Sequence, residues 1–289
     1  MPKRAASTGN TRSDRGPLGT GPFLRSVQRR AGGDEERFPF TVPAIRTLRA
    51  LDLTAPVTFF VGENGSGKST LIEAIAAAAD LPAVGSEDLD GDGTLAAQRL
   101  LADALRLVWN RRTRRGFFLR AEDFFGFTKR LAVMRAGLLE RLGEIETEYA
   151  DRSEYAKGLA AGPVRASLGA LESRYGVDLD ANSHGQSFLR LFQSRFVPGG
   201  LYLLDEPEAP LSPQSQLGLI AMMAGMVAQD AQFIIATHSP ILMAYPGATI
   251  VSFDHAPVER VQYEELESVR MVRDFLVDPQ RYLRHLDGR

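Results

Sequence analysis

Runs of apolar residues alternate along this chain with stretches of helical periodicity. Continuous apolar runs at 57–61, 201–204 and 232–236 have the length and content of buried strands. Helical patterns occupy 69–79, after the first run, and 213–228, between the other two. Strands that alternate with helices predict an α/β fold around a mainly parallel sheet.

The other segments are assigned from the same patterns, and no internal repeat is visible. Further short strands are predicted at 23–30, 38–46, 51–53, 116–121, 248–253 and 261–263. Further helices are predicted at 95–111, 128–149, 186–196 and 267–276, and the glycine-interrupted stretch to about 175 is also predicted to be helical.

The chain divides into an arm and one domain. Residues 1–22 are rich in Gly, Ser, Thr, Pro and Arg and nearly free of apolar residues, so they predict a disordered basic arm. A solvated tail is the favoured interpretation, and contact with nucleic acid or a partner is the alternative. We expect one domain over 23–289, with a mainly helical insert at about 128–182.

Composition excludes several classes of site. The net charge of −2 gives no basic excess that would point to nucleic acid, and four histidines lack metal-ligand spacing. The absence of cysteine excludes disulfides, cysteine-ligated zinc and iron–sulfur clusters. The longest apolar run, 217–228, contains two glycines and is shorter than the ~20 residues that a bilayer requires. With no signal peptide at the N-terminus, we predict a cytoplasmic protein without direct membrane insertion.

A phosphate-binding motif follows the strand at 57–61. The pattern G-x-x-x-x-G-K-[ST] is satisfied, with a helix after it, by Gly62, Glu63, Asn64, Gly65, Ser66, Gly67, Lys68 and Ser69, followed by Thr70. Glycines let the backbone wrap around phosphate, and the helix N-terminus adds partial positive charge. Lys68 is predicted to contact the β- and γ-phosphates, Ser69 to ligate Mg2+ and Thr70 to lie beside the phosphates, so ATP and Mg2+ are the expected ligands.

Two acids end the strand at 201–204. Asp205 is predicted to hold Mg2+, directly or through water, and Glu206 to polarise the attacking water or accept its proton. The alternative is a helix N-cap followed by an acid of the first turn. Because the P-loop is present, we favour the catalytic interpretation, and Lys68 and Glu206 are candidate catalytic residues.

The motifs together resemble those of ATP-binding cassette (ABC) ATPases. The P-loop is similar to theirs, as are 205–213, which include a D-loop-like stretch, and 237–239, where His238 resembles their switch histidine. The segment Ser183-His184-Gly185-Gln186-Ser187 resembles a degenerate form of their Ser-Gly-Gly signature. The match runs from about residue 38 to 253 and is most similar to small stand-alone predicted ATPases without a transport domain. The implied fold is the RecA-like core with an antiparallel β edge and a helical insert.

The chain departs from that family at three places. His184 replaces a glycine of the signature, and Glu122 occupies the position expected for the Q-loop glutamine, where it is a candidate Mg2+ or water contact. No pair of long heptad arms is visible, and the insert is far shorter than the coiled coils of chromosome-structural or break-repair ATPases. We therefore do not expect a long-armed DNA tether.

The resemblance also implies a cycle. A head-to-tail homodimer closes on two ATP molecules, with Ser183 and Gly185 of one subunit on the γ-phosphate held by the other, and drives a protein partner. His238 would be catalytic through contacts with the γ-phosphate and the attacking water. The structural alternatives are a plain N-cap for Ser183 and a cap or core polar group for His238.

Other interpretations remain open. The ATP-hydrolysing subunit of a membrane transporter and a nucleotide-gated binding module that does not hydrolyse ATP are the alternative functions. Phe38 or Phe40 is a candidate for stacking on adenine, although a core role is favoured. The basic cluster at 111–115 favours a solvated loop over binding to nucleic-acid phosphates.

Overall fold

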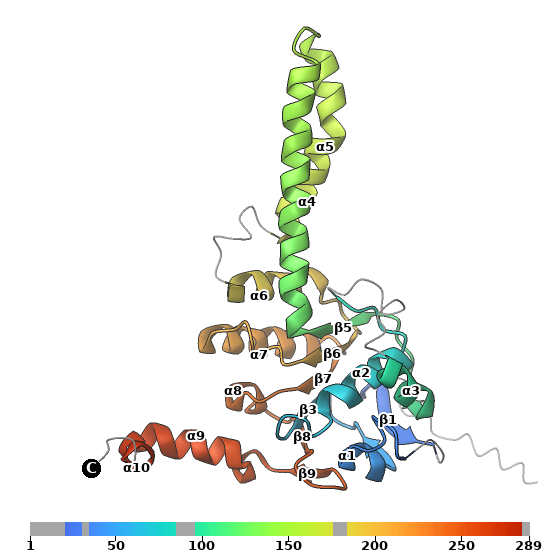
Figure 1. The fold of residues 1–289 in the computed structure, drawn as a ribbon, viewed down its shortest axis with the longest axis vertical. Coiled ribbons are helices and arrows are strands. Elements are labelled where there is room, and N and C mark those ends of the chain that lie inside the picture. The colour runs from blue at the N-terminus through green and yellow to red at the C-terminus, as the bar shows by residue number, and fades with distance from the viewer. Residues whose placement is uncertain (1–20, 31–34, 85–95, 176–183, 285–289) are drawn as a thin grey trace, which may run out of the picture.

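The computed structural model describes residues 21–30, 35–84, 96–175 and 184–284. Almost all of the arm predicted at 1–22 therefore lies outside the described residues. A six-stranded sheet forms the centre of the molecule (Figure 1). Its strand order is β5 (Gly116–Arg120), β6 (Leu201–Asp205), β7 (Gln232–Ala236), β3 (Val57–Val61), β8 (Thr249–Ser252) and β9 (Glu259–Val261).

This sheet is mainly parallel, as predicted. The five strands from β5 to β8 are parallel, and β9 joins β8 in the antiparallel direction. Full burial on both faces explains why β3, β6 and β7 are mostly apolar, with one polar or charged residue in each: Thr58, Asp205 and Gln232. The α/β fold and its antiparallel edge are therefore confirmed.

A second, antiparallel sheet of three strands has the order β2 (Ala50–Asp52), β1 (Leu24–Arg29) and β4 (Leu105–Trp109). Two predictions are wrong in this part. Residues 38–46 are not a strand, because they form turns and the short helix α1 (Pro43–Thr47), with proline at its first position. The predicted helix at 95–111 ends early as α3 (Ala96–Ala104), because 105–109 pair with β1 as a strand.

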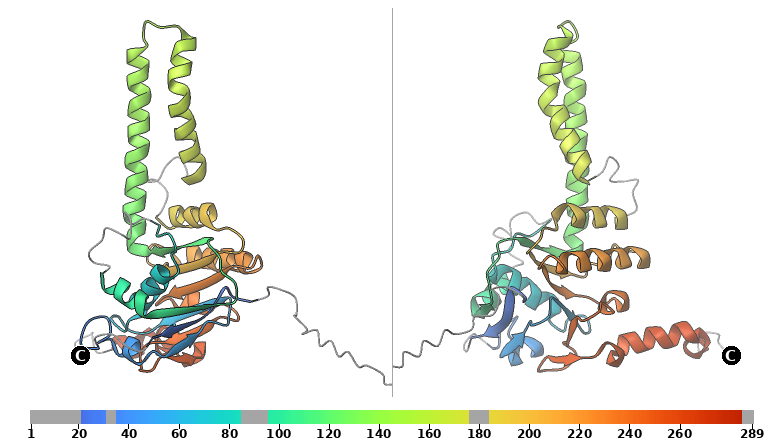
Figure 2. Two further views of the ribbon diagram at one scale, coloured as in Figure 1. Left: turned by 90° about the vertical axis from the view of Figure 1, so that its right-hand side faces the viewer. Right: turned by 180° about the vertical axis from the view of Figure 1, so that it is seen from behind.

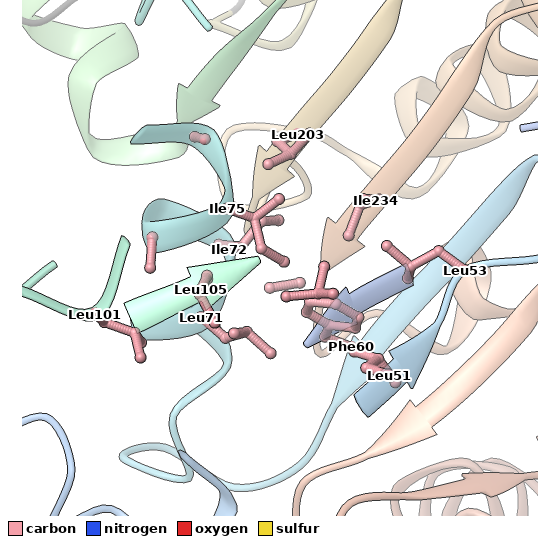
Figure 3. Close-up of a cluster of buried hydrophobic side chains, with 14 of the residues drawn as sticks. Leu51, Leu53, Phe60, Leu71, Ile72, Ile75, Leu101, Leu105, Leu203 and Ile234 are labelled. Atoms are coloured by element: carbon pink, nitrogen blue, oxygen red, sulfur yellow. The ribbon is translucent and has the colours of Figure 1, made fainter. Parts of the chain in front are cut away.

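Helices cover both faces of the central sheet (Figure 2). The helix α2 (Lys68–Ala78) packs with the second sheet on one face, around the apolar cluster of Figure 3. The other face is covered by α6 (His184–Arg195), α7 (Pro213–Val227) and α8 (Pro240–Met243). Adjacent residues of β3 separate the two cores, since Phe59 belongs to the second and Phe60 to the first.

A helical hairpin projects from this body (Figures 1 and 2). It consists of α4 (Ala121–Glu148), of 28 residues, and α5 (Glu154–Tyr175), of 22 residues, joined across their length by contacts such as Arg135–Glu172 at 3.0 Å. The helix predicted at 128–149 begins instead at 121, directly after β5. Helices were predicted at 128–149 and on to about 175, and both are present, but no sustained heptad in the sequence marked them as a long pair.

Beyond β9 the described residues form a single turn, η2 (Tyr263–Glu265), and the helices α9 (Glu267–Val277) and α10 (Pro279–Leu283). Among the described residues, no helix has the length and apolar content needed to span a bilayer.

Gly116 is the tightest point between β5 and β6. Its φ is +122°, and a Cβ atom there would lie 1.8 Å from the carbonyl oxygen of Leu201. We expect Gly116→Ala to lower the free energy of unfolding by about 3 kcal/mol or more, as measured by denaturant titration. Gly137→Ala is the control, because a Cβ meets nothing within 4 Å there and the position is helical, so stability should rise by about 0.5–1 kcal/mol. Wild-type stability of Gly116→Ala would contradict this packing.

Candidate functional site

The predicted P-loop connects β3 to α2 as a tight backbone turn. Gly67, the N-cap of α2, has φ +103°, and a Cβ atom there would lie 2.9 Å from Cγ1 of Val42. Only glycine fits this position without displacing the segment before α1. The N–H groups of the first turn of α2, which have no partner within the helix, consequently face the loop, where they can donate to an anion.

Lys68 lies inside this loop, with 4% of its surface exposed. Its Nζ donates to the carbonyl oxygens of Gly62, at 2.7 Å, and Glu63, at 2.8 Å. Burial lowers the pKa of the Lys68 ammonium, and four carboxylates oppose that shift: Glu206, Asp205, Asp254 and Glu208. The ammonium is thus held where acids from two segments converge, the end of β6 with its loop and the loop after β8.

Asp254 is a site residue that the sequence analysis did not find. One carboxylate oxygen accepts from the amide of Glu63 at 2.8 Å, and the other accepts from the hydroxyl of Ser252 at 3.0 Å. It therefore fixes the P-loop to the end of β8. Asp254 directly follows the apolar stretch 248–253, but its role becomes visible only because β8 pairs with β3.

Asp205 and Ser69 meet, although 136 residues separate them. The hydroxyl of Ser69, in the first turn of α2, donates to Oδ1 of Asp205 at 3.1 Å. Burial raises the pKa of Asp205 to about 7; the hydrogen bond from Ser69 opposes this shift, Glu73 and Glu206 add to it, and Arg120 opposes it.

These two residues fit a magnesium ion. A hydroxyl and a carboxylate are hard oxygen ligands, and Mg2+ in nucleotide sites is held by one or two such groups together with phosphate oxygens. The carboxylate of Asp205 lies among further acids, so a cation beside it would stabilise its charged form.

A partly buried ion pair lies beside Asp205, and the sequence did not indicate it. Arg120, the register partner of Asp205 on β5, lies 2.6 Å from the carboxylate of Glu73 on α2. Burial raises the pKa of Glu73, and its interactions with Arg120 and Gln98 oppose that shift. The pair joins α2, one turn after Ser69, to the strand end from which α4 begins.

Glu206 and His238 face one another at an open pocket. Glu206 Oε1 lies 3.6 Å from His238 Nε2, and both side chains are partly exposed. Glu206 has a φ of +50°, a left-handed conformation that is rare outside glycine, and its amide donates to the carbonyl of Ala236 at 2.9 Å. The pocket has a volume of about 530 Å³, and Glu63 and Asn64 complete its lining. The base and histidine predicted from separate motifs therefore share one cavity with the P-loop.

Other predicted site residues are not among the residues that line this cavity, or cannot be placed. Glu122 is exposed in the first turn of α4, two residues after Arg120. Ser183 lies outside the described residues, and Gly185 belongs to the first turn of α6, which packs on α5 and α7.

The two candidates for stacking on adenine differ in exposure. Phe40 is 5% exposed and belongs to the core, with the Arg29 guanidinium 5.1 Å from its ring centre. Phe38 is 51% exposed and lies four residues before Val42, which contacts the P-loop at Gly67.

The basic cluster at 111–115 lies at the other end of the sheet, before the first residue of β5. Arg111 lies 4.4 Å from the ring centre of Phe23 and 3.5 Å from Asp230. Arg115 donates to the carbonyl of Pro198 at 3.2 Å. Two of its four arginines therefore hold loops of this chain together, which favours the structural interpretation.

Comparison with known proteins adds the following. The family model described as "AAA domain" matches residues 44–88, the segment that contains α1, the P-loop and α2, and so confirms the resemblance to P-loop ATPases. A search of curated proteins gave no match.

Solved structures that match this chain include a nucleotide-free ATP-binding cassette from an ABC transporter, with 17% identity, 90% of this chain and 97% of that chain covered, and a TM-score of 0.43. Another is cbiO1 of Clostridium perfringens, part of an ABC transporter complex, with 15% identity, coverage of 93% and 100%, and a TM-score of 0.41. A third is the Smc head domain with an extended coiled coil bound to the C-terminal domain of ScpA, from Pyrococcus furiosus, with 12% identity, coverage of 88% and 99%, and a TM-score of 0.40.

Proposed function

We propose that this chain binds Mg-ATP at the P-loop and hydrolyses it to ADP and phosphate. The contact between Ser69 and Asp205 at 3.1 Å carries the proposal, because it joins the phosphate loop to the acidic strand end that such a reaction requires. An incidental glycine-rich turn would have no reason to meet a buried carboxylate from a distant strand.

Each group at the site has a task in this reaction. Lys68 and the amides of the P-loop bind the phosphates, and Ser69 and Asp205 hold Mg2+, which when bound neutralises charge on the phosphate oxygens. The Glu206 carboxylate orients the attacking water and accepts its proton. His238, 3.6 Å away, donates to the same water or to the γ-phosphate.

The assembly is a further part of the proposal. We propose a head-to-tail homodimer in which Ser183 and Gly185 complete the site of the opposite subunit, and a protein partner that the cycle of closing and opening drives. A role for Glu122 at Mg2+ or water and a cytoplasmic location remain predictions.

The test is multiple-turnover release of phosphate. The purified chain with Mg-ATP should release many equivalents of phosphate per chain, and chelation of Mg2+ should stop release. Tight ATP binding without turnover would favour the alternative of a nucleotide-gated binding module. Co-purification with a membrane protein would favour the transporter alternative.

Phe38 provides a separate prediction about the base of the nucleotide. Its ring is exposed and precedes by four residues Val42, which approaches the P-loop at Gly67, so we propose that it stacks on adenine. We expect Phe38→Ala to weaken Mg-ATP binding about 5- to 100-fold in a titration with a fluorescent analogue, the range of about 1–3 kcal/mol for one aromatic–base contact. Thermal stability should be unchanged.

Phe40→Ala gives the matched comparison, since it should reduce the free energy of unfolding by about 3–5 kcal/mol, as expected for an emptied core position. Equal ATP affinity in Phe38→Ala and wild type would remove Phe38 from the site.

A further inference from the structure

One side chain links the two loops that carry Glu206 and His238. Glu208 lies in the loop after β6, and its Oε1 accepts a hydrogen bond from the backbone amide of His238 at 2.7 Å. The hydroxyl of Thr237 also donates to this carboxylate. A single acid thereby binds two consecutive residues at the end of β7.

Glu208 is half-buried, and one oxygen of its carboxylate is enclosed. Its Oε2 is buried and has no hydrogen-bond partner among the described residues. Burial raises the pKa of Glu208, and the hydrogen bonds from the His238 amide and from Thr237 oppose that shift. Burying a carboxylate oxygen without a hydrogen-bond partner costs free energy. An acid at this position therefore has a role other than keeping the protein surface soluble.

Helix capping does not explain it. The helix α8 already has its cap in Ser239, whose hydroxyl accepts from the amides of Ile241 and Leu242, both at 3.2 Å. The bond from His238 to Glu208 lies before that cap. It fixes the backbone of the histidine and adds nothing to the helix.

The loop of Glu206 is fixed in a complementary way. The amide of Glu206 donates to Ala236 at 2.9 Å, and its carbonyl accepts from the amide of Ala209 at 3.1 Å. The carbonyl of Glu208 itself accepts from the amide of Leu211 at 2.8 Å. Glu208 therefore belongs to a hydrogen-bonded turn, and its side chain fixes the distance between that turn and the backbone of His238.

We propose that Glu208 is a positioning residue, which holds His238 against Glu206 by bonding the backbone of the histidine. The proposal rests on the hydrolytic function proposed above and adds to it the group that fixes the geometry of its two reacting side chains. Glu208 acts through His238 and not on the nucleotide, so its removal should change turnover without changing nucleotide affinity.

A double-mutant cycle tests this. Glu208→Ala should lower kcat about 10- to 100-fold, because a displacement of about 1 Å in a reacting group has an effect of that size, with Kd for Mg-ATP within about twofold of wild type. Glu208→Gln should keep kcat within about threefold, since its amide oxygen still accepts from the His238 amide. In a His238→Ala background, Glu208→Ala should change kcat by less than about twofold. Equal losses in both backgrounds, or a loss confined to Kd, would overturn the proposal.

A measurement without nucleotide separates this proposal from the proposed function. In the full chain, amide hydrogen exchange at His238 should accelerate about tenfold or more in Glu208→Ala and stay near wild type in Glu208→Gln, as expected for loss of a charge-assisted hydrogen bond. Unchanged exchange refutes the positioning role even if the protein hydrolyses ATP. If exchange is faster in Glu208→Ala but the wild-type protein shows no ATP turnover, the hydrolytic function is refuted and the backbone contact of Glu208 is established. Glu259→Ala, on exposed β9, is the control for removal of an acid, with no change expected in exchange or turnover.

Discussion

Replacing Glu206 by Gln is expected to leave Mg-ATP bound while slowing its hydrolysis by about 10²-fold or more. The amide is nearly the same size as the carboxylate but cannot accept the proton of the attacking water, and general-base catalysis contributes about 10²–10⁴-fold. Because hydrolysis is the step that opens the proposed dimer, the variant should accumulate as an ATP-bound dimer. Phosphate release and size-exclusion chromatography with light scattering measure the two effects.

The control for Glu206→Gln is Glu259→Gln, which removes an exposed acid on β9, far along the sheet from β6. It should match wild type in turnover and in assembly. A Glu206→Gln protein that stays monomeric with saturating ATP would contradict the proposed dimer while leaving the assignment of the base intact. Undiminished hydrolysis would remove that assignment.

Lys68→Ala is expected to weaken ATP binding by about 10²-fold. The ammonium is the buried cation of the P-loop, already within 2.7–2.8 Å of two backbone carbonyls, and hydrogen bonds to charged groups are worth about 1.5–3 kcal/mol. Calorimetric titration with Mg-ATP measures the loss.

Lys129→Ala, on the exposed surface of α4, is the matched control and should bind ATP as wild type does. Thermal unfolding without nucleotide shows whether Lys68→Ala remains folded, since Lys68 also contacts Gly62 and Glu63. A folded Lys68→Ala protein with wild-type affinity would show that phosphate does not bind at this loop.

Local signals predicted β3, the P-loop and α2 well, because each is short in sequence and unambiguous in composition. The two failures have different physical causes, one of which is pairing between distant segments. Residues 105–109 continue the amphipathic pattern of the preceding helix, and they become β4 only because β1 offers a partner about 80 residues earlier. At 38–46, aromatic and β-branched residues suggested a strand, whereas Pro43 started a helix.

The candidate site was predictable in its motifs but not in the groups that hold them. Asp205, Glu206 and His238 could be named because each follows an apolar strand with a recognisable pattern. Asp254, the Glu73–Arg120 pair and Glu208 carry no such signature, since their partners are 191, 47 and 30 positions away along the chain. Their roles depend on strand order, which periodicity does not determine.

The ion pair between Arg120 and Glu73 connects the base of the hairpin to the proposed nucleotide site. Arg120 is the last residue before α4, whose 28 residues extend about 42 Å. A rotation of about 10° that shifts the first turn of the helix, about 5.4 Å long, by about 1 Å carries its far end about 7 Å. A movement of about 1 Å beside Asp205 thus becomes a movement about seven times larger at the far end of α4.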